Sequence, residues 1–210
     1  MEIRYKNKIQ QNNFNYSIKV ESKSHNNTTI FVYGFDNQRR VMDFSDANGN
    51  TKKVYYFGDY EYTETNTDTK ELHYINGVGG LNAIYVIDNN AGATNGNLYF
   101  VTKDYLGSVL ALFDENNNIV DENSFDPWGR KRNPNDWSYD MSYKSTMTLP
   151  NLTDRGYTGH EHLEDFQLIN MNGRIYDLIT HQMTGPDILD ANPYSTQAYN
   201  RYAYVTNNSL

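Results

Sequence analysis

The feature that most constrains this chain is a series of short Asp/Asn/Gly turns separating segments of β-forming residues. Residues 46–50 read DANGN and residues 114–118 read DENNN, and the Asn-Gly pair of the first is a strong hairpin signal. The aspartates at 36 and 46, and those at 104 and 114, are both ten residues apart. This interval predicts two short strands and two turns per unit, and therefore consecutive antiparallel hairpins.

The predicted architecture is mainly β, with antiparallel hairpins forming a curved open sheet or partial shell and little helix. Residues 54–62 are predicted to form one strand, residues 77–80 a glycine-rich turn, and residues 133–150 irregular loops. Only Glu161 to Phe166 could form one or two helical turns, because no segment keeps apolar residues at helical spacing for longer. The predicted strands are Ile30–Tyr33, Arg39–Phe44, Glu71–Ile75, Ala83–Ile87, Leu98–Thr102, Val109–Phe113 and Ile119–Val120.

Composition excludes several function classes. The net charge of −8 would repel nucleic-acid phosphates, and the absence of cysteine excludes disulfides and thiolate chemistry. No apolar run is long enough for a membrane span, and the first residues lack the apolar region of a Sec signal peptide. Nineteen tyrosines supply apolar area to an otherwise polar chain, so a tyrosine-walled fold can still be packed.

Several spaced motifs resemble those of one known family. LYFVTKDYLGSV at residues 98–109 resembles the opening of the RHS repeat-associated core domain, and FDPWGR at residues 125–130 resembles a tyrosine-aspartate (YD) repeat. GYTGHE at 156–161, NGRIYD at 172–177 and NRYAY at 200–204 are similar to its middle and end. The motif residues are Asp104, Leu106, Gly107, Ser108, Phe125, Asp126, Pro127, Trp128, Gly129, Arg130, Gly159, Arg174, Tyr176, Asp177, Asn200, Arg201 and Tyr202.

The resemblance implies a division of the chain and a packaging role. Residues 1–28 would be an N-terminal arm or first strand, residues 29–97 degenerate YD-type hairpins, and residues 98–210 the core domain without its second Asp-Pro motif. Such domains close the end of a hollow β-shell, so the expected function is a non-catalytic scaffold or plug that carries or encloses a C-terminal polymorphic toxin. Export or cell-surface display within a larger bacterial system is the expected location, and no cofactor is expected.

Asp187 is the candidate catalytic residue. Counting from Arg174 along the family pattern places Asp187 on the first aspartate of a self-cleaving aspartyl protease, which works when two close carboxylates share one proton. Ile188 stands where the family has proline, and the chain ends before the second Asp-Pro motif. The alternative function is therefore one half of an autoprotease that needs residues beyond 210.

Other candidates are weaker. DPWG at residues 126–129 spells the protease tetrapeptide, but its position after a strand favours a turn. His160 and His162 would share one face of a strand, yet two imidazoles are too few for a metal site. A further alternative is a carbohydrate-binding or adhesion module, in which aromatic rings stack on sugars. The same rings could instead pack between neighbouring hairpins. These residues are Tyr55, Tyr56, Tyr60, Tyr62, Tyr85, Tyr99, Trp128 and Trp137.

The expected partners follow from the open sheet. A sheet cut from a spiral leaves an edge strand, which predicts a homodimer, pairing with the rest of an RHS shell or its toxin, or capping by residues 1–27. Nucleic acid and a membrane span are not expected.

Overall fold

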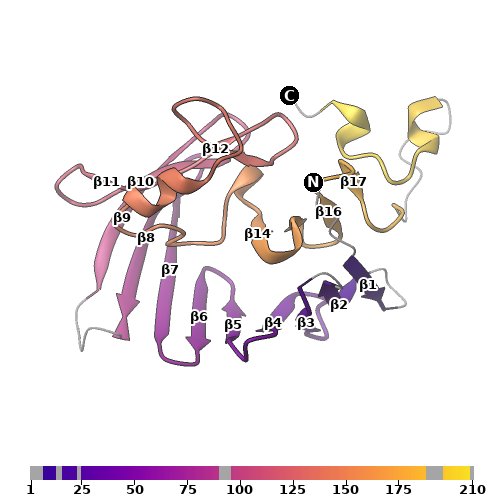
Figure 1. Ribbon diagram of the computed structural model, residues 1–210, viewed down its shortest axis with the longest axis horizontal. Helices are drawn as coiled ribbons and strands as arrows, with labels where there is room; N and C mark the ends of the chain where they lie inside the picture. The colour runs from indigo at the N-terminus through magenta and orange to yellow at the C-terminus, as the bar shows by residue number, and fades with distance from the viewer. Residues whose placement is uncertain (1–6, 13–15, 23–24, 90–95, 188–195, 209–210) are drawn as a thin grey trace.

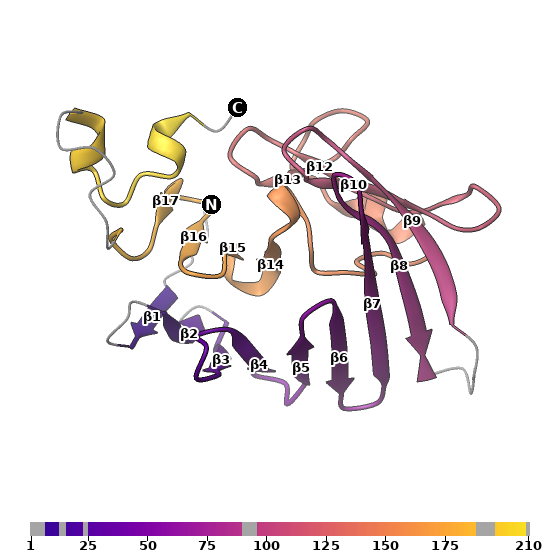
Figure 2. The same ribbon diagram turned by 180° about the vertical axis from the view of Figure 1, so that it is seen from behind.

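The computed structural model describes residues 7–12, 16–22, 25–89, 96–187 and 196–208. Among these residues, eleven strands form one antiparallel sheet in strict sequence order. The sheet curves, and the C-terminal part of the chain lies on its concave side in both views (Figure 1, Figure 2). The strands are β1 (Asn7–Gln11), β2 (Ser17–Ser22), β3 (Asn27–Tyr33), β4 (Arg39–Ser45), β5 (Thr51–Phe57), β6 (Tyr60–Thr65), β7 (Thr69–Gly77), β8 (Gly80–Asp88), β9 (Asn97–Lys103), β10 (Val109–Phe113) and β11 (Ile119–Glu122).

The rest of the chain forms smaller elements. β12 (Ser124–Phe125) and β13 (Lys131–Arg132) make a short hairpin, and β14 (Glu161–Leu163), β15 (Leu168–Asn170), β16 (Ile175–Asp177) and β17 (Gln182–Met183) form a second sheet. The described helical segments are single 3-10 turns: η2 (Ser142–Thr146), η3 (Tyr157–Gly159), η4 (Glu164–Phe166), η5 (Thr196–Tyr199) and η6 (Val205–Asn207). None of the described helices is long and apolar enough to span a membrane.

The mainly β prediction is confirmed, and so are the glycine-rich turn at Gly77–Gly80 and the irregular loops at 133–150, apart from η2. Residues 54–62 are a correction. They form the end of β5 and the start of β6, because Gly58 adopts a φ of 70° and closes a two-residue loop between Phe57 and Tyr60. The β-forming aromatic residues on both sides of this glycine made the segment read as one strand.

Two further predictions are wrong. The ten-residue interval between turn aspartates encloses one strand, β4 or β10, rather than two. Residues 161–163 form strand β14 rather than helix, and only residues 164–166 make one 3-10 turn. Pairing with β15 and burial of all three side chains explain the strand: Leu163 joins the core of β2 to β5, and Glu161 binds Arg39 and Tyr56 of the large sheet.

Alternation of side chains along the strands builds the core. In β3, Thr29 and Phe31 are buried, whereas Ile30 and Val32 point outward. Residues of β2 to β5 pack against the second sheet, and fully burying each large apolar side chain contributes about 1.5–3 kcal/mol. This cluster comprises Val20, Phe31, Met42, Val54, Tyr56, Leu163, Phe166, Leu168 and Ile175.

The predicted boundaries at residues 28 and 97 fall inside or beside strands of the continuous sheet. Residues 7–11 and 17–22 extend that sheet as β1 and β2, and residue 97 begins β9. At the other edge, the segment after β13 returns to β11, where the Leu149 amide donates to the Val120 carbonyl at 2.9 Å. Among the described residues, β1 pairs with a strand on one side only.

Candidate functional site

The candidate catalytic residue Asp187 lies in a cluster with two arginines, Arg174 from its own family pattern and Arg201 from a later motif. Its carboxylate forms an ion pair with Arg174, with Oδ2 and Nη2 2.9 Å apart. Its backbone amide donates to the Arg201 carbonyl at 2.8 Å, and Arg201 Nε donates to the Asp187 carbonyl at 2.7 Å. Arg174 Nη1 also donates to the Arg201 carbonyl at 3.3 Å. The structure therefore brings these three predicted residues together.

The cluster has the chemistry of a structural ion pair. An aspartyl mechanism needs a second carboxylate that shares a proton with the first, whereas Arg174 holds the Asp187 carboxylate by charge-assisted contact. Ile188, which departs from the family pattern, lies outside the described residues. Gly185 shows how closely this segment approaches the large sheet, because an added Cβ there would overlap the side chain of Gln11 on β1. The catalytic role of Asp187 stays a prediction.

The DPWG segment forms a turn, as predicted from its position. The Asp126 amide donates to the Arg130 carbonyl at 2.9 Å, and Asp126 Oδ1 accepts from the amides of Trp128 and Arg130 at 2.9 and 3.0 Å. Gly129 supplies the left-handed position with a φ of 86°. All of these bonds lie within the turn, which joins β12 to β13.

The same five-residue turn recurs elsewhere in the sheet. Asp46 and Asp114 each accept two backbone amides through Oδ1, and through Oδ2 Asp114 accepts one side-chain amide and Asp46 two. These bonds lower the pKa of both carboxyls, with the side-chain amides of Asn50 and Asn118 as the largest causes. Asp104 makes the equivalent bond to Ser108, and Gly107 takes the left-handed position. The repeated aspartates are therefore turn formers.

The other motif residues hold the C-terminal region together. Ser108 is fully buried and accepts the Thr158 amide at 3.1 Å, while Leu106 and Phe125 pack against a core that includes Tyr176. Gly159 is left-handed at a φ of 71°. Asp177 Oδ1 accepts the Ile179 amide, and the Pro127 carbonyl accepts from the Tyr157 hydroxyl. Asn200 Oδ1 accepts the Tyr202 amide, and the Tyr202 carbonyl accepts the Met183 amide.

The histidine pair does not form the predicted arrangement. His160 precedes β14, and its Nδ1 lies 2.8 Å from Thr158 Oγ1. His162 is buried, and its Nε2 accepts the Tyr157 amide at 3.1 Å. His181 stacks on Trp128 with ring centroids 5.2 Å apart. No group of three or more His, Cys, Asp or Glu residues within the described ranges is arranged to hold a metal ion.

The aromatic rings of the strands lie on both faces of the sheet. Tyr60, His73 and Tyr85 form a row across β6 to β8, with centroids 4.7 and 6.1 Å apart and planes tilted by 50° and 54°. Tyr55 and Tyr62 form another cross-strand pair, with centroids 6.0 Å apart and planes tilted by 44°. Because these rings pack on one another, they act as cross-strand pairs of the sheet.

Sequence reasoning missed a seam of buried ion pairs between the concave face and the C-terminal region. Arg39 Nη1 lies 2.5 Å from Glu161 Oε2, and Tyr56 donates to Glu161 Oε1 at 2.5 Å. Burial alone would lower the pKa of Arg39, but the neighbouring Glu161 overcomes this and raises it. Burial also raises the pKa of Tyr56 well above its ordinary value, which keeps the phenol a hydrogen-bond donor.

The seam continues along the sheet. Arg155 Nη2 lies 2.7 Å from Glu61 Oε1, and Tyr74 donates to Glu61 Oε2 at 2.9 Å. Lys52 forms an ion pair with Asp154. Burial raises the pKa of Glu61, against the opposing effect of Arg155. The charges of one layer are thus neutralised by the other, which fixes the register between them.

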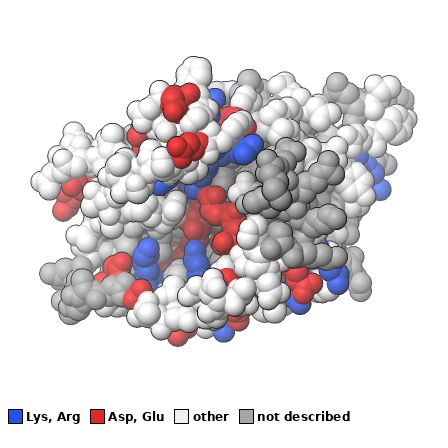
Figure 3. All heavy atoms as spheres, in the orientation of Figure 1, with Lys and Arg blue, Asp and Glu red and all other residues white. Residues whose placement is uncertain are grey.

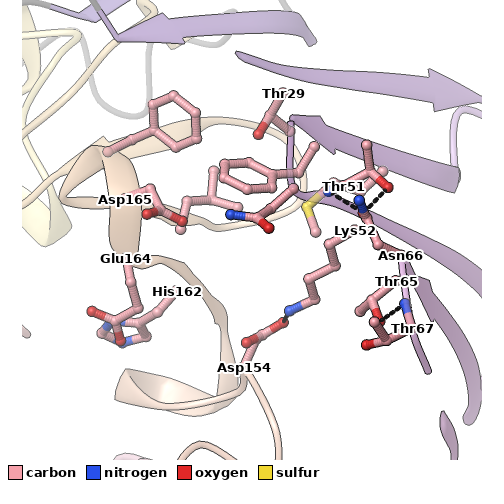
Figure 4. A pocket seen from close by; sticks show the side chains of 15 residues that line it. Thr29, Thr51, Lys52, Thr65, Asn66, Thr67, Asp154, His162, Glu164 and Asp165 are labelled. Atoms are coloured by element: carbon pink, nitrogen blue, oxygen red, sulfur yellow. Dashed lines mark hydrogen bonds and ion pairs between the residues drawn. The ribbon is translucent and has the colours of Figure 1, made fainter. Parts of the chain in front are cut away.

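A cavity of about 310 Å³ opens beside this seam, between β3 to β6 and residues 162–166. Figure 4 shows Lys52 and Asp154 pointing toward each other across the gap, with His162 and Glu164 close together on the C-terminal side. Phe44, Phe166 and Leu163 supply apolar walls. At this cavity Glu164 is paired with Lys131, and Lys52 is paired with Asp154 across the gap, so the second contact holds the two layers together.

A second cavity, of about 270 Å³, is lined by carboxylates and two lysines: Glu61, Asp68, Asp88, Asp154, Lys52 and Lys70. Figure 3 shows acidic side chains gathered in a hollow at the middle of one face, with basic side chains on either side. The concave side is therefore polar and charged where the C-terminal region does not cover it.

Comparison with known proteins connects this geometry to solved toxin structures. No family model and no curated protein matches the chain. A crystal structure of TcdB2-TccC3 matches with a TM-score of 0.75 at 18% identity, over 97% of this chain and 10% of that one. The fold is RHS-like. The Photorhabdus luminescens Tc holotoxin pore with a mutated TccC3 (TM-score 0.74, 16% identity) and TcdB2-TccC3 without its hypervariable C-terminal region (0.69, 16%) match over the same shares of both chains.

The chain thus spans about a tenth of the length of the proteins it resembles. At these identities the similarity shows the fold. It covers the concave sheet and the C-terminal region together, since 97% of the chain is matched. The assignment of residues 98–210 to the core domain in particular stays a prediction.

Proposed function

We propose that this chain is a non-catalytic wall segment of an RHS-type shell that carries or encloses a C-terminal toxin. The observation that carries the proposal is the match of 97% of the chain, at a TM-score of 0.75, to a small part of a large Tc toxin assembly. Eleven strands in sequence order suit such a wall, because each added hairpin extends the same sheet without a crossover. The charged concave face would then line the interior.

The strand β1 is the proposed point of attachment to the rest of the shell. A sheet edge offers backbone donors and acceptors to a further strand, whereas β11 is already covered by the segment that contains Leu149. The partner is accordingly a strand of the same shell, and export within a larger bacterial system belongs to the same proposal.

The test uses the complete gene product that contains this segment. Expressed whole, it should form a hollow β-particle by electron microscopy, and the polypeptide downstream of residue 210 should resist trypsin. The same downstream polypeptide expressed alone is the control and should be digested rapidly. Equal digestion rates in the two samples would sink the proposal.

A second function, self-cleavage using Asp187, is supported by one observation: Arg174 and Asp187, which belong to one family pattern, meet Arg201 from another motif. In the complete gene product, Asp187→Asn should then abolish any cleavage downstream of residue 210, whereas Asp177→Asn should preserve it. Asp177 is a suitable control because it lies in the same motif and forms a turn. Cleavage that survives Asp187→Asn would rule this function out.

A further inference from the structure

A lysine, an aspartate and an asparagine share one buried cluster at the edge of the large sheet. Lys144 lies in η2, Asp121 in β11, and Asn123 directly after β11. Lys144 Nζ contacts Asp121 Oδ1 and donates to Asn123 Oδ1 at 3.0 Å. The three residues are only 9%, 1% and 7% exposed. An amine is therefore held beside a carboxamide and a carboxylate, with little access for water.

The surrounding backbone holds these groups in place. Asp121 and Asn123 are two residues apart in extended chain and project to the same side. Opposite them, Tyr143 donates to the Glu122 carbonyl at 3.1 Å, and the Asn151 amide donates to Asp121 Oδ2 at 3.1 Å. The Lys144 amine thus contacts the oxygen that is bonded to the carboxamide carbon of Asn123. Holding two reacting groups this close raises their effective concentration greatly.

The electrostatics favour a reactive amine. Burial lowers the pKa of Lys144, although Asp121 opposes this effect. In a site poor in water, a buried ion pair loses much of its advantage over the neutral amine and carboxylic acid. The neutral amine is the nucleophilic form, and the neutral acid is able to return the proton.

We propose that Lys144 and Asn123 form an intramolecular amide crosslink, with Asp121 carrying the proton. Nζ first transfers a proton to the Asp121 carboxylate and then attacks Cγ of Asn123, so that the new N–C bond makes a tetrahedral centre. Asp121 returns the proton to Nδ2, the Cγ–Nδ2 bond breaks, and the nitrogen leaves as ammonia, which takes up the second proton lost from Nζ. The step needs no oxidant and no cofactor.

The crosslink would have a mechanical purpose. Lys144 and Asn123 are 21 residues apart, and the segment between them contains the β12–β13 hairpin. Joining them would tie η2 and the hairpin permanently to β11, the edge that the returning segment covers. Closing this segment covalently would restrict the unfolded chain. This inference is independent of the proposed shell function, because it concerns one reaction within the chain.

Intact-mass spectrometry of the folded chain tests the inference. The wild-type protein should weigh less than its sequence by one ammonia, and digestion should give a branched peptide joining the segments of Asn123 and Lys144. Lys144→Arg keeps the positive charge but cannot form the amide, and Asp121→Asn removes the proton carrier. Both variants should show the full sequence mass. Lys131→Arg, a lysine paired with Glu164 nearby, is the matched control and should keep the loss.

The outcomes separate clearly. A full sequence mass for wild-type protein that is folded by circular dichroism would overturn the proposal without any variant. Succinimide formation at an Asn-Gly pair also releases ammonia, but it would persist in Lys144→Arg, and that result would overturn the assignment. A protein mass lower by one water, with the branched peptide joined at Asp121, would show that Lys144 reacts with Asp121 and would overturn the assignment of Asn123.

Discussion

Single buried charges carry much of the contact between the two layers, and Glu161 is the sharpest example. Replacing it by glutamine leaves the Arg39 guanidinium buried opposite a neutral group, which should destabilise the fold by about 3–5 kcal/mol. Asp43→Asn is the control, because Asp43 and Lys53 form an exposed pair at 3.2 Å whose loss should hardly move the urea midpoint. Equal midpoints for the two variants would contradict the seam's structural role.

The buried imidazole of His162 makes stability depend on pH. Burial lowers its pKa well below the ordinary 6.5, with the charge of Lys131 acting in the same direction. Below pH 6.5 the unfolded chain therefore binds more protons than the folded chain, so this contribution is complete above 6.5 and is lost as the pH falls. The loss should be about 1.4 kcal/mol per pH unit until the folded-state pKa is reached.

Urea unfolding at pH 7.5 and 5.5 measures this effect (pH values about one unit either side of the ordinary histidine pKa). His162→Gln keeps an acceptor for the Tyr157 amide but cannot titrate, so its free energy of unfolding should fall less between the two values. A smaller decline should remain, because burial also lowers the pKa of His160. An identical decline in both proteins would show that His162 is not the titrating group.

At the scale of elements, two copies of the same turn allow the cost of backbone strain to be measured apart from the cost of overpacking. Gly49 and Gly129 take the same left-handed position, with φ of 83° and 86°. An added Cβ meets nothing within 4 Å at Gly49, but it would lie 2.6 Å from the Tyr157 ring at Gly129. Gly49→Ala should cost about 1–2 kcal/mol from the backbone alone. Gly129→Ala should cost about 1–3 kcal/mol more, because it overpacks the core.

Thermal unfolding of the two variants gives this comparison directly. The difference between them is the informative quantity, since the turn geometry cancels. Equal costs would mean that the hairpin of the DPWG segment does not pack on Tyr157 as the structure shows.

The turns and strands were predictable because their signals are local. The turn around Asp114 is predicted by the residue types at fixed offsets within a few positions, because Asp114 binds the amides of Asn116 and Asn118. The loop at Gly58 was missed because a single glycine between aromatic strand formers is a weak local signal. The ion pairs were beyond prediction for another reason: Lys52 and Asp154 are 102 residues apart, and nothing in either neighbourhood identifies its partner. The same holds for Tyr56 and Glu161.

Of the candidate site, the turn role of Asp126 followed from its sequence position. The convergence of Arg174, Asp187 and Arg201 did not follow from spacing alone, because Asp187 and Arg201 are 14 residues apart in different motifs. The cluster of Lys144 with Asp121 and Asn123 also left no sequence signal, since a lysine in an irregular loop is normally solvent-exposed. Sequence thus predicted the antiparallel hairpins, whereas the structure identified the contacts that join the two layers.

At the scale of the whole molecule, the concave packing predicts one cooperative unit. Ile175 in the second sheet is 1% exposed and joins the core of β2 to β5, so Ile175→Ala should cost about 2–5 kcal/mol. Both tryptophans, Trp128 and Trp137, lie outside that core, whereas circular dichroism reports mainly the large sheet. If the molecule unfolds as one unit, Ile175→Ala should shift the urea midpoints from fluorescence and dichroism equally.

The control is Ile179→Ala, because the Ile179 side chain is 52% exposed. This variant should keep the free energy of unfolding from both probes within about 0.5 kcal/mol of wild type. A shift in the dichroism midpoint alone would show that the region around Trp128 and Trp137 unfolds separately from the large sheet. The two layers would then not form one cooperative unit.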